Sequence, residues 1–205
     1  MQRIEAESSR MGVLVDDLLL LARLDQGRPL DSQEVDLALV ASEAVESARA
    51  IEPDRSIELD ASSPAILRGD VGRLRQVIDN LLDNARVHTP AGSSVHVSVV
   101  VEGVDDEVVL TVADEGPGLS AEVEGRAFER FYRGDQVRSR GTGGAGLGLS
   151  IVSAIVEAHG CKVAATSREG GGAVFEVRLP AGGMAPTPDP ESGGDPVGPG
   201  PAGEP

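Results

Sequence analysis

The first part of the chain carries an amphipathic pattern. In residues 3–26, large apolar residues such as Leu14, Leu18 and Leu21 recur at heptad-like positions, with charged residues between them. This spacing predicts one helix, and the Gly-then-Pro signal in residues 27–29 predicts its end. A single helix cannot bury its own apolar stripe, so we expect it to pack against a partner helix or a second chain.

From about residue 33 the pattern becomes a mixture of strand and helix periodicities. The predicted strands are 34–35, 56–60, 65–69, 95–101, 107–113, 162–167 and 173–179. The predicted helices are 37–51, 71–87, 121–131 and 147–159. Asp36 and Asp70 stand where they can cap the first two of these helices. The order of elements predicts an α/β fold, and residues 132–143 show little periodicity and indicate a loop.

Composition divides the chain into three parts. We expect residues 1–29 to be a separate helical piece, 30–180 to be one domain, and 181–205 to be a disordered tail rich in Pro, Gly and acidic residues. No apolar stretch approaches the roughly 20 residues of a membrane-spanning helix, and no signal peptide opens the chain. The lone Cys161 excludes an internal disulfide and fits a reducing compartment, which predicts a cytoplasmic location.

The formal net charge of −16 predicts that the chain repels nucleic acid. Residues 126–140 depart from this balance, because their cationic side chains outnumber Glu129 and Asp135. The cations of this segment are Arg126, Arg130, Arg133, Arg138 and Arg140. A concentrated basic segment in an acidic protein indicates a local anion site.

Asn80 and Asn84 are four residues apart in a predicted helix, so they share one helix face. Asparagine is disfavoured inside helices, so two on one face call for a reason. Neutral amide oxygens can ligate Mg²⁺, an octahedral ion that is usually held by few protein ligands plus phosphate oxygens and water.

Two glycine-containing segments follow. Asp114 ends an alternating strand just before Gly116 and Gly118, where an acidic acceptor can bind an exocyclic amine and glycines let backbone pass close to a base. Residues 143–149 read Gly-Gly-Ala-Gly-Leu-Gly-Leu and open a predicted helix, whose free N–H groups favour phosphate. No Gly-Lys-Ser/Thr follows, so the segment is not a Walker loop.

These three segments, in this order and spacing, resemble the ATP-binding catalytic domain of two-component sensor histidine kinases, a branch of the gyrase/Hsp90/MutL ATPase superfamily. The resemblance covers about residues 3–180. It implies a two-layer α/β sandwich, with a mixed, mostly antiparallel sheet of about five strands, three helices on one face, and one preceding helix of a dimerisation hairpin. It implies the cofactors ATP and Mg²⁺.

The resemblance also implies roles for residues. Adenine recognition falls to Asp114, and metal contact to Asn84 first and Asn80 second. The implied nucleotide-binding residues are Asn80, Asn84, His88, Asp114, Gly116, Gly118, Gly144, Gly146, Leu147 and Gly148. Residues 128–133 resemble the family's phenylalanine box, and the implied catalytic residues are Asn84, Arg130, Arg133 and Arg140. The chain departs from the family pattern at Val87, where a basic residue is common.

The family's phosphoacceptor histidine lies in a box resembling His-Glu-Leu-Arg-Thr-Pro, and none of His88, His96 and His159 has that context. We expect a C-terminal piece of a longer, membrane-anchored kinase. Its expected partners are the acceptor-histidine dimerisation domain, a response regulator and, through residues 3–26, a second copy of the chain.

Three alternatives remain. An ATP-hydrolysing clamp of the same superfamily is disfavoured because Asp79 replaces the expected glutamate and no transducer domain follows residue 180. A Ser/Thr kinase of the anti-sigma type usually lacks the preceding helix. A non-catalytic nucleotide-binding or dimerisation module stays open because of Val87 and the missing histidine.

Overall fold

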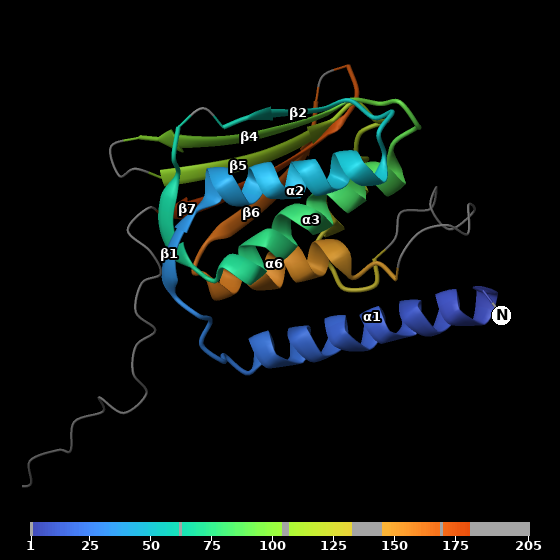
Figure 1. The fold of residues 1–205 in the computed structure, drawn as a ribbon, viewed down its shortest axis with the longest axis horizontal. Helices are drawn as coiled ribbons and strands as arrows, with labels where there is room; N and C mark the ends of the chain where they lie inside the picture. Colours follow the sequence, from blue (N-terminus) through green and yellow to red (C-terminus); the bar gives the residue numbers. More distant parts are fainter. Residues whose placement is uncertain (1, 62, 104–106, 133–144, 169, 181–205) are drawn as a thin grey trace, which may run out of the picture.

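The computed structural model describes residues 2–61, 63–103, 107–132, 145–168 and 170–180, and these form two layers (Figure 1). Three helices lie along one face of a sheet. They are α2 (Leu37–Ile51), α3 (Val71–His88) and α6 (Gly148–Ala158). This confirms the two-layer α/β sandwich that the sequence predicts.

The main sheet has five strands in the order β2-β4-β5-β7-β6. These are β2 (Ile57–Asp60), β4 (Val95–Glu102), β5 (Glu107–Asp114), β6 (Lys162–Ser167) and β7 (Ala173–Pro180). Only the β2–β4 pair is parallel, and the other three pairs are antiparallel. The expected mixed, mostly antiparallel sheet is therefore confirmed, with both predicted hairpins in place.

A second, two-stranded sheet pairs β1 (Gln33–Asp36) with β3 (Ile66–Gly69). The neighbouring strands β2 and β3 therefore belong to different sheets, although a short turn joins them. Asp36 accounts for this arrangement, because its Oδ1 accepts hydrogen bonds from the N–H groups of Ala65 and of Ala38 in the first turn of α2, both at 3.1 Å. The bond to Ala65 draws the start of β3 towards β1.

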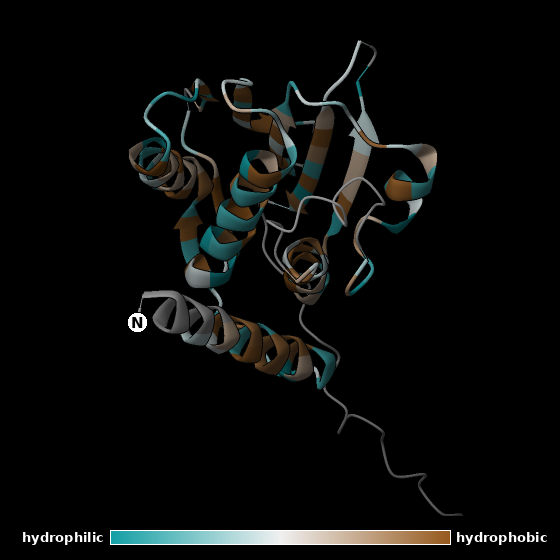
Figure 2. Cartoon of the chain, turned by 90° about the vertical axis from the view of Figure 1, so that its right-hand side faces the viewer, coloured by the Kyte–Doolittle hydropathy of each residue, from teal (hydrophilic) through white to brown (hydrophobic). Residues whose placement is uncertain are grey.

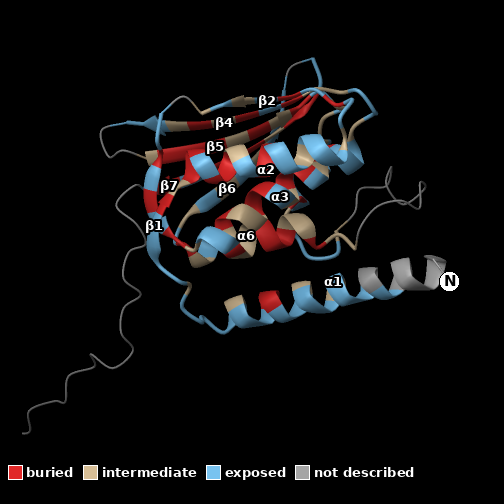
Figure 3. Ribbon diagram, in the orientation of Figure 1, coloured by how far each residue is buried: buried red, intermediate tan, exposed pale blue. Residues whose placement is uncertain are grey.

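The helices are ordered by caps and by burial of one face. The Asp70 side chain caps α3 by accepting from the Arg73 N–H at 3.1 Å. All six apolar residues expected on one face of α3 are buried, namely Leu74, Val77, Ile78, Leu81, Leu82 and Ala85. They meet the apolar side of the sheet, and Figure 3 shows the buried residues gathered between the two layers.

Helix α1 (Gln2–Asp25) lies outside the two layers and packs against α6. Leu20 and Leu21 are buried, whereas other apolar side chains of α1 stay exposed, notably Met11, Val13, Val15, Leu18 and Leu19. Figure 2 shows this hydrophobic character along the C-terminal half of the helix. Helix α6 is thus the partner that the sequence predicts for α1, but it covers only one face of α1. Among the described residues, no helix has the length and apolarity needed to cross a membrane.

The predicted helix over 121–131 is too long. Helix α4 spans only Ala121–Arg126, and the chain then turns until Phe131 adopts a φ of 62°. This left-handed backbone conformation cannot continue a helix. The expected loop over 132–143 and the expected tail over 181–205 lie outside the described residues, apart from Tyr132, so the three-part division of the chain stays a prediction.

Candidate functional site

Asp114 ends β5 with only 4 % of its surface exposed. Its Oδ1 accepts hydrogen bonds from the backbone N–H groups of Gly116 at 2.8 Å and Ala173 at 3.2 Å. Two backbone donors therefore hold one carboxylate oxygen in a fixed orientation. Every hydrogen bond that the described residues donate to the Asp114 side chain goes to Oδ1, so Oδ2 is the oxygen that can accept from a ligand.

The loop that follows Asp114 is tightly packed at its glycines. A Cβ on Gly116 would lie 2.7 Å from Cγ2 of Thr89 and 2.8 Å from Oδ1 of Asp114, so only glycine fits there. Gly118 has a φ of 78°, and a Cβ there would lie 3.2 Å from the carbonyl oxygen of Gly172. The loop is thus held between the end of α3 and the β6–β7 hairpin, and its glycines do permit the close approach that the sequence predicts.

Asn80 and Asn84 lie on the same side of α3, and Asn80 faces the start of α6. Nδ2 of Asn80 is buried and has no hydrogen-bond partner among the described residues. Oδ1 of Asn80 lies 3.7 Å from where a Cβ of Gly148 would stand. An unpaired buried amide costs about 1–3 kcal/mol, so this side chain calls for a partner from outside the described residues. Asn84 is half-buried one turn further along the helix.

The N-terminus of α6 presents free backbone donors. Leu147 occupies the N-cap position, and no side chain from the described part of the chain caps the helix. Gly146 precedes it with a φ of 74°, and the first turn begins at Gly148. Unsatisfied N–H groups and the helix dipole at such an end favour an anion. Gly144 lies outside the described residues.

The structure gives Arg130 a protein partner. Its Nη2 donates to both carboxylate oxygens of Asp25, at 2.6 and 2.9 Å, and so joins the segment after α4 to the end of α1. This hydrogen bond holds the pKa of Asp25 below its ordinary value. Both side chains are exposed, so solvent screens the pair. Arg133 and Arg140, the other two arginine candidates, lie outside the described residues.

The two ends of the segment between α4 and α6 meet. The N–H of Phe131 donates to the carbonyl oxygen of Gly146 at 3.0 Å. This backbone hydrogen bond places the turn that contains Phe131 beside the glycine segment before α6. His88 is the exposed last residue of α3, and Val87 beside it is 37 % exposed.

Helix α3 connects the parts of the candidate site. Asn80 contacts the region of Gly148, and Thr89, directly after the helix, packs on Gly116. The structure thus places Asn80 beside Gly148 along α3, and Gly116 and Asp114 beside Thr89 at the end of the same helix. Sequence reasoning missed Thr89, and it also missed Arg55, whose side chain donates to Thr89 from a distant loop. No local pattern signals a contact between residues 34 positions apart.

Comparisons with known proteins identify relatives of the chain. Residues 69–183 match the family described as histidine kinase-, DNA gyrase B-, and HSP90-like ATPase. The chain is 46 % identical to the probable sensor histidine kinase TcrY of Mycobacterium tuberculosis, in a match covering 91 % of this chain and 39 % of TcrY. It is 42 % identical to the sensor histidine kinase TrcS of the same species, covering 87 % of this chain and 35 % of TrcS.

A solved structure shares the fold. Full-length ShkA in complex with AMPPNP is 31 % identical to this chain and superposes with a TM-score of 0.71. That match covers 88 % of this chain and 38 % of ShkA. The chain therefore spans less than two-fifths of the length of each of these relatives.

Proposed function

The chain belongs to the family of histidine kinase-, DNA gyrase B- and HSP90-like ATPases, as the ATP-binding catalytic domain of a sensor histidine kinase. We propose that it binds Mg-ATP and transfers the γ-phosphoryl group to a histidine on a separate helical hairpin. The observation that carries this proposal is the carboxylate of Asp114, which two backbone N–H groups hold beside a glycine loop. The buried Nδ2 of Asn80, which has no hydrogen-bond partner in the described part of the chain, supports it.

In this proposal Asp114 accepts a hydrogen bond from the exocyclic amine of adenine through Oδ2. Gly116 and Gly118 let the base lie close to the backbone. The phosphates lie towards the N-terminus of α6, where the N–H groups at Gly146, Leu147 and Gly148 stabilise negative charge. Gly144 and His88 complete the proposed contacts with the nucleotide.

Asn80 and Asn84 are suitable ligands for the Mg²⁺ ion that binds together with ATP. The side chains of Asn80 and Asn84 can each supply a neutral oxygen from one face of α3, and the buried Nδ2 of Asn80 has no hydrogen-bond partner among the described residues. Which of the two amide atoms is oxygen is a matter of assignment, so the side chain can turn its oxygen towards a cation. Bound Mg²⁺ would neutralise phosphate charge during transfer.

Phosphoryl transfer needs charge neutralisation and alignment more than covalent help. We assign the positive charge at the γ-phosphate to Arg133 or Arg140. Arg130 is already engaged by Asp25, so a catalytic role would require it to exchange a carboxylate for the phosphate. Asn84 holds the metal and thereby aligns the reacting phosphate.

We propose three partners. The first is the dimerisation domain that bears the acceptor histidine, and the second is a response regulator that receives the phosphoryl group. The third is a second copy of the chain, which would cover the exposed apolar side chains of α1, including Leu18 and Leu19. The net charge of −16 supports no role in binding nucleic acid.

A titration tests the nucleotide site. Isothermal calorimetry of the whole chain with ATP, ADP and GTP, each with and without Mg²⁺, is expected to give saturable adenine-nucleotide binding that Mg²⁺ strengthens. Asn84→Ala is expected to remove most of the Mg²⁺ effect and to leave the affinity measured without metal unchanged. Equal binding of GTP and ATP, or an unaltered Mg²⁺ effect in the variant, would contradict the assignments.

A second candidate function rests on Val87, which is partly exposed where the resembled pattern often has a basic residue. Loss of that cation favours a module that binds a nucleotide without transferring phosphate. Acceptor-dependent transfer of the γ-phosphoryl group separates the two functions, because a binding module would show saturable binding and no labelled acceptor.

A further inference from the structure

We propose that Arg55 is a positioning residue of the nucleotide site, which sets the affinity for adenine by holding Thr89 against the glycine loop that follows Asp114. This inference rests on the proposed function. Arg55 does not touch the candidate site itself, and it stands between α2 and β2, far from the glycine segments in sequence.

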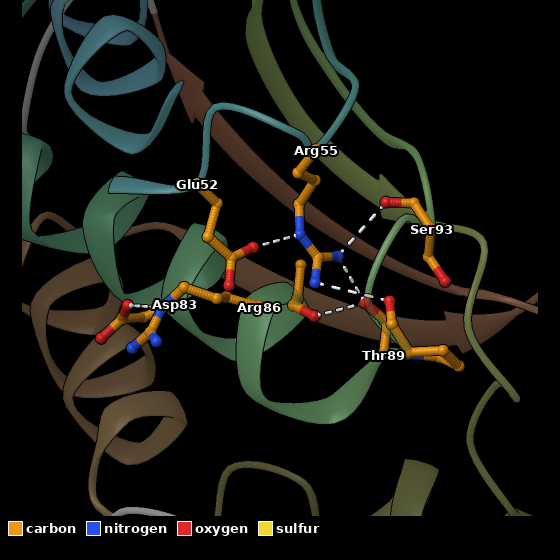
Figure 4. A network of polar contacts seen from close by, with 8 residues as sticks. Glu52, Arg55, Asp83, Arg86, Thr89 and Ser93 are labelled. Atoms are coloured by element: carbon orange, nitrogen blue, oxygen red, sulfur yellow. Dashed lines mark hydrogen bonds and ion pairs between the residues drawn. The ribbon is translucent and has the colours of Figure 1, made fainter. Parts of the chain in front are cut away.

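Arg55 is a buried cation with four acceptors. Its side chain is 5 % exposed, and its Nε donates to Glu52. Its other nitrogens donate to Oγ1 of Thr89 at 2.7 Å and to the carbonyl oxygens of Ser93 at 3.2 Å and Pro90 at 3.5 Å (Figure 4). Arginine is rarely buried this fully unless it is paired and hydrogen-bonded, and the planar guanidinium can meet several acceptors at once.

Three of these acceptors belong to the turn that leads from α3 to β4. The guanidinium therefore joins the loop before β2 to the turn after α3 (Figure 4). The same turn is tied to the nucleotide loop by backbone, because the N–H of Glu115 donates to the carbonyl oxygen of Ser94 at 3.1 Å. A shift of the turn would thus move the residue next to Asp114.

Thr89 carries the positioning contact. Its hydroxyl accepts from Arg55 and donates to the carbonyl oxygen of Ala85 at 2.7 Å, which fixes the side chain in one rotamer. With the hydroxyl fixed, the methyl group Cγ2 points towards Gly116, where it leaves no room for a Cβ. The N–H of Gly116 in turn holds Oδ1 of Asp114. Arg55 is thus linked to the proposed adenine acceptor by three successive contacts, through Thr89 and Gly116.

Arg49 provides a matched control. It too is an arginine that ties an element to its neighbour, although it is an exposed residue, and it donates through Nε and Nη2 to the carbonyl oxygen of Ile57. It joins α2 in the helical layer to β2 in the sheet. The described residues give it no hydrogen bond to the turn after α3, so its loss should destabilise the fold without reaching the nucleotide loop.

The test compares Arg55→Lys with Arg49→Lys in the whole chain. One ammonium cannot span the separated acceptors that the guanidinium joins. We expect Arg55→Lys to weaken ADP binding about tenfold, and Arg49→Lys to change it less than twofold, while both lower the melting temperature. In a transfer assay Arg55→Lys should raise KM for ATP and leave kcat unchanged, because the lysine variant disturbs binding of the base.

Variants at Thr89 make the test independent of whether Arg55→Lys folds. Thr89→Val keeps a methyl group for Gly116 but removes the acceptor for Arg55, and we expect it to weaken ADP binding to a similar degree. The double variant Arg55→Lys, Thr89→Val should bind ADP no more weakly than either single variant, because both changes break the same hydrogen bond between Arg55 and Thr89.

The outcomes are distinguishable from those of the proposed function. If the unaltered chain binds no ADP, the proposed function fails. If the unaltered chain binds ADP and the Arg55→Lys or Thr89→Val variant binds it within twofold, the positioning role is overturned. Equal losses of affinity in Arg55→Lys and Arg49→Lys would also overturn it, because they would report general destabilisation.

Discussion

The Asp114 side chain has two oxygens with separable tasks, so two substitutions should affect nucleotide affinity and stability differently. Asp114→Asn keeps Oδ1 as an acceptor for the N–H groups of Gly116 and Ala173, but it replaces the ligand-facing Oδ2 by an amide donor. Asp114→Ala removes both oxygens. We therefore expect the asparagine variant to lose nucleotide affinity with little loss of stability, and the alanine variant to lose both.

The magnitudes follow from the contacts of Asp114. A hydrogen bond to a charged group contributes about 1.5–3 kcal/mol, so losing the bond from adenine should weaken ADP binding about ten- to hundredfold. Alanine also leaves two backbone donors without their acceptor, at about 1–3 kcal/mol each. This predicts that the alanine variant is destabilised by about 2–6 kcal/mol and melts about 10 °C lower.

Calorimetric titration with ADP and urea unfolding of the same samples measure the two effects. An asparagine variant that binds ADP within twofold of the unaltered chain would refute the adenine assignment. An alanine variant as stable as the unaltered chain would refute the structural part of the reasoning, which rests on the buried backbone bonds to Oδ1.

Three further predictions follow from other contacts. Gly116→Ala should weaken ADP binding about tenfold and destabilise the fold by about 1–3 kcal/mol, because a Cβ there would lie 2.7 Å from a side-chain carbon. Gly125→Ala, with nothing within 4 Å, is its control, and equal effects would contradict the packing argument. Burial lowers the pKa of His159 from 6.5, so the unfolded chain binds the proton first and stability should fall as pH drops below about 6.5. His159→Gln should flatten that fall in urea unfolding at pH 7.5 to 5, and an unchanged slope would exclude His159 as its cause. Arg130→Gln should leave the ratio of ATP to ADP affinity unchanged, because Asp25 holds its guanidinium; a selective loss of ATP affinity would restore Arg130 to the γ-phosphate.

Local chemistry made much of the fold predictable. Asp36 and Asp70 mark the starts of α2 and α3, and the structure places both helices where the sequence predicts them. The helix over 121–131 was overestimated because its periodicity continues past Arg126. The chain there is redirected by a distant contact, the bond from Phe131 to Gly146.

The candidate site also has a part that the sequence predicts and a part that depends on distant contacts. Asp114, Gly116 and Gly148 stand out in the sequence because they belong to two glycine-containing segments that follow an asparagine-containing helix in a fixed order. The meeting of Asn80 with Gly148 and of Arg55 with Thr89 depends on how α3 packs on α6 and on the loop before β2. Such contacts arise from the packing of whole elements, so they cannot be predicted from the spacing of residues along the chain.

Transfer of a radiolabelled γ-phosphoryl group from Mg-ATP to a helical hairpin with a His-Glu-Leu-Arg-Thr-Pro box, supplied in trans, tests the central claim most directly. We predict a label on the hairpin that is stable in alkali and lost in acid, as for phosphohistidine. The label should be absent with a His→Gln hairpin and reduced at low ATP concentration with Asp114→Asn. Release of phosphate without a labelled hairpin would instead identify an ATP-hydrolysing clamp. An acid-stable label would identify a Ser/Thr kinase, and binding with no transfer would identify a non-catalytic module; each of these results would contradict the account.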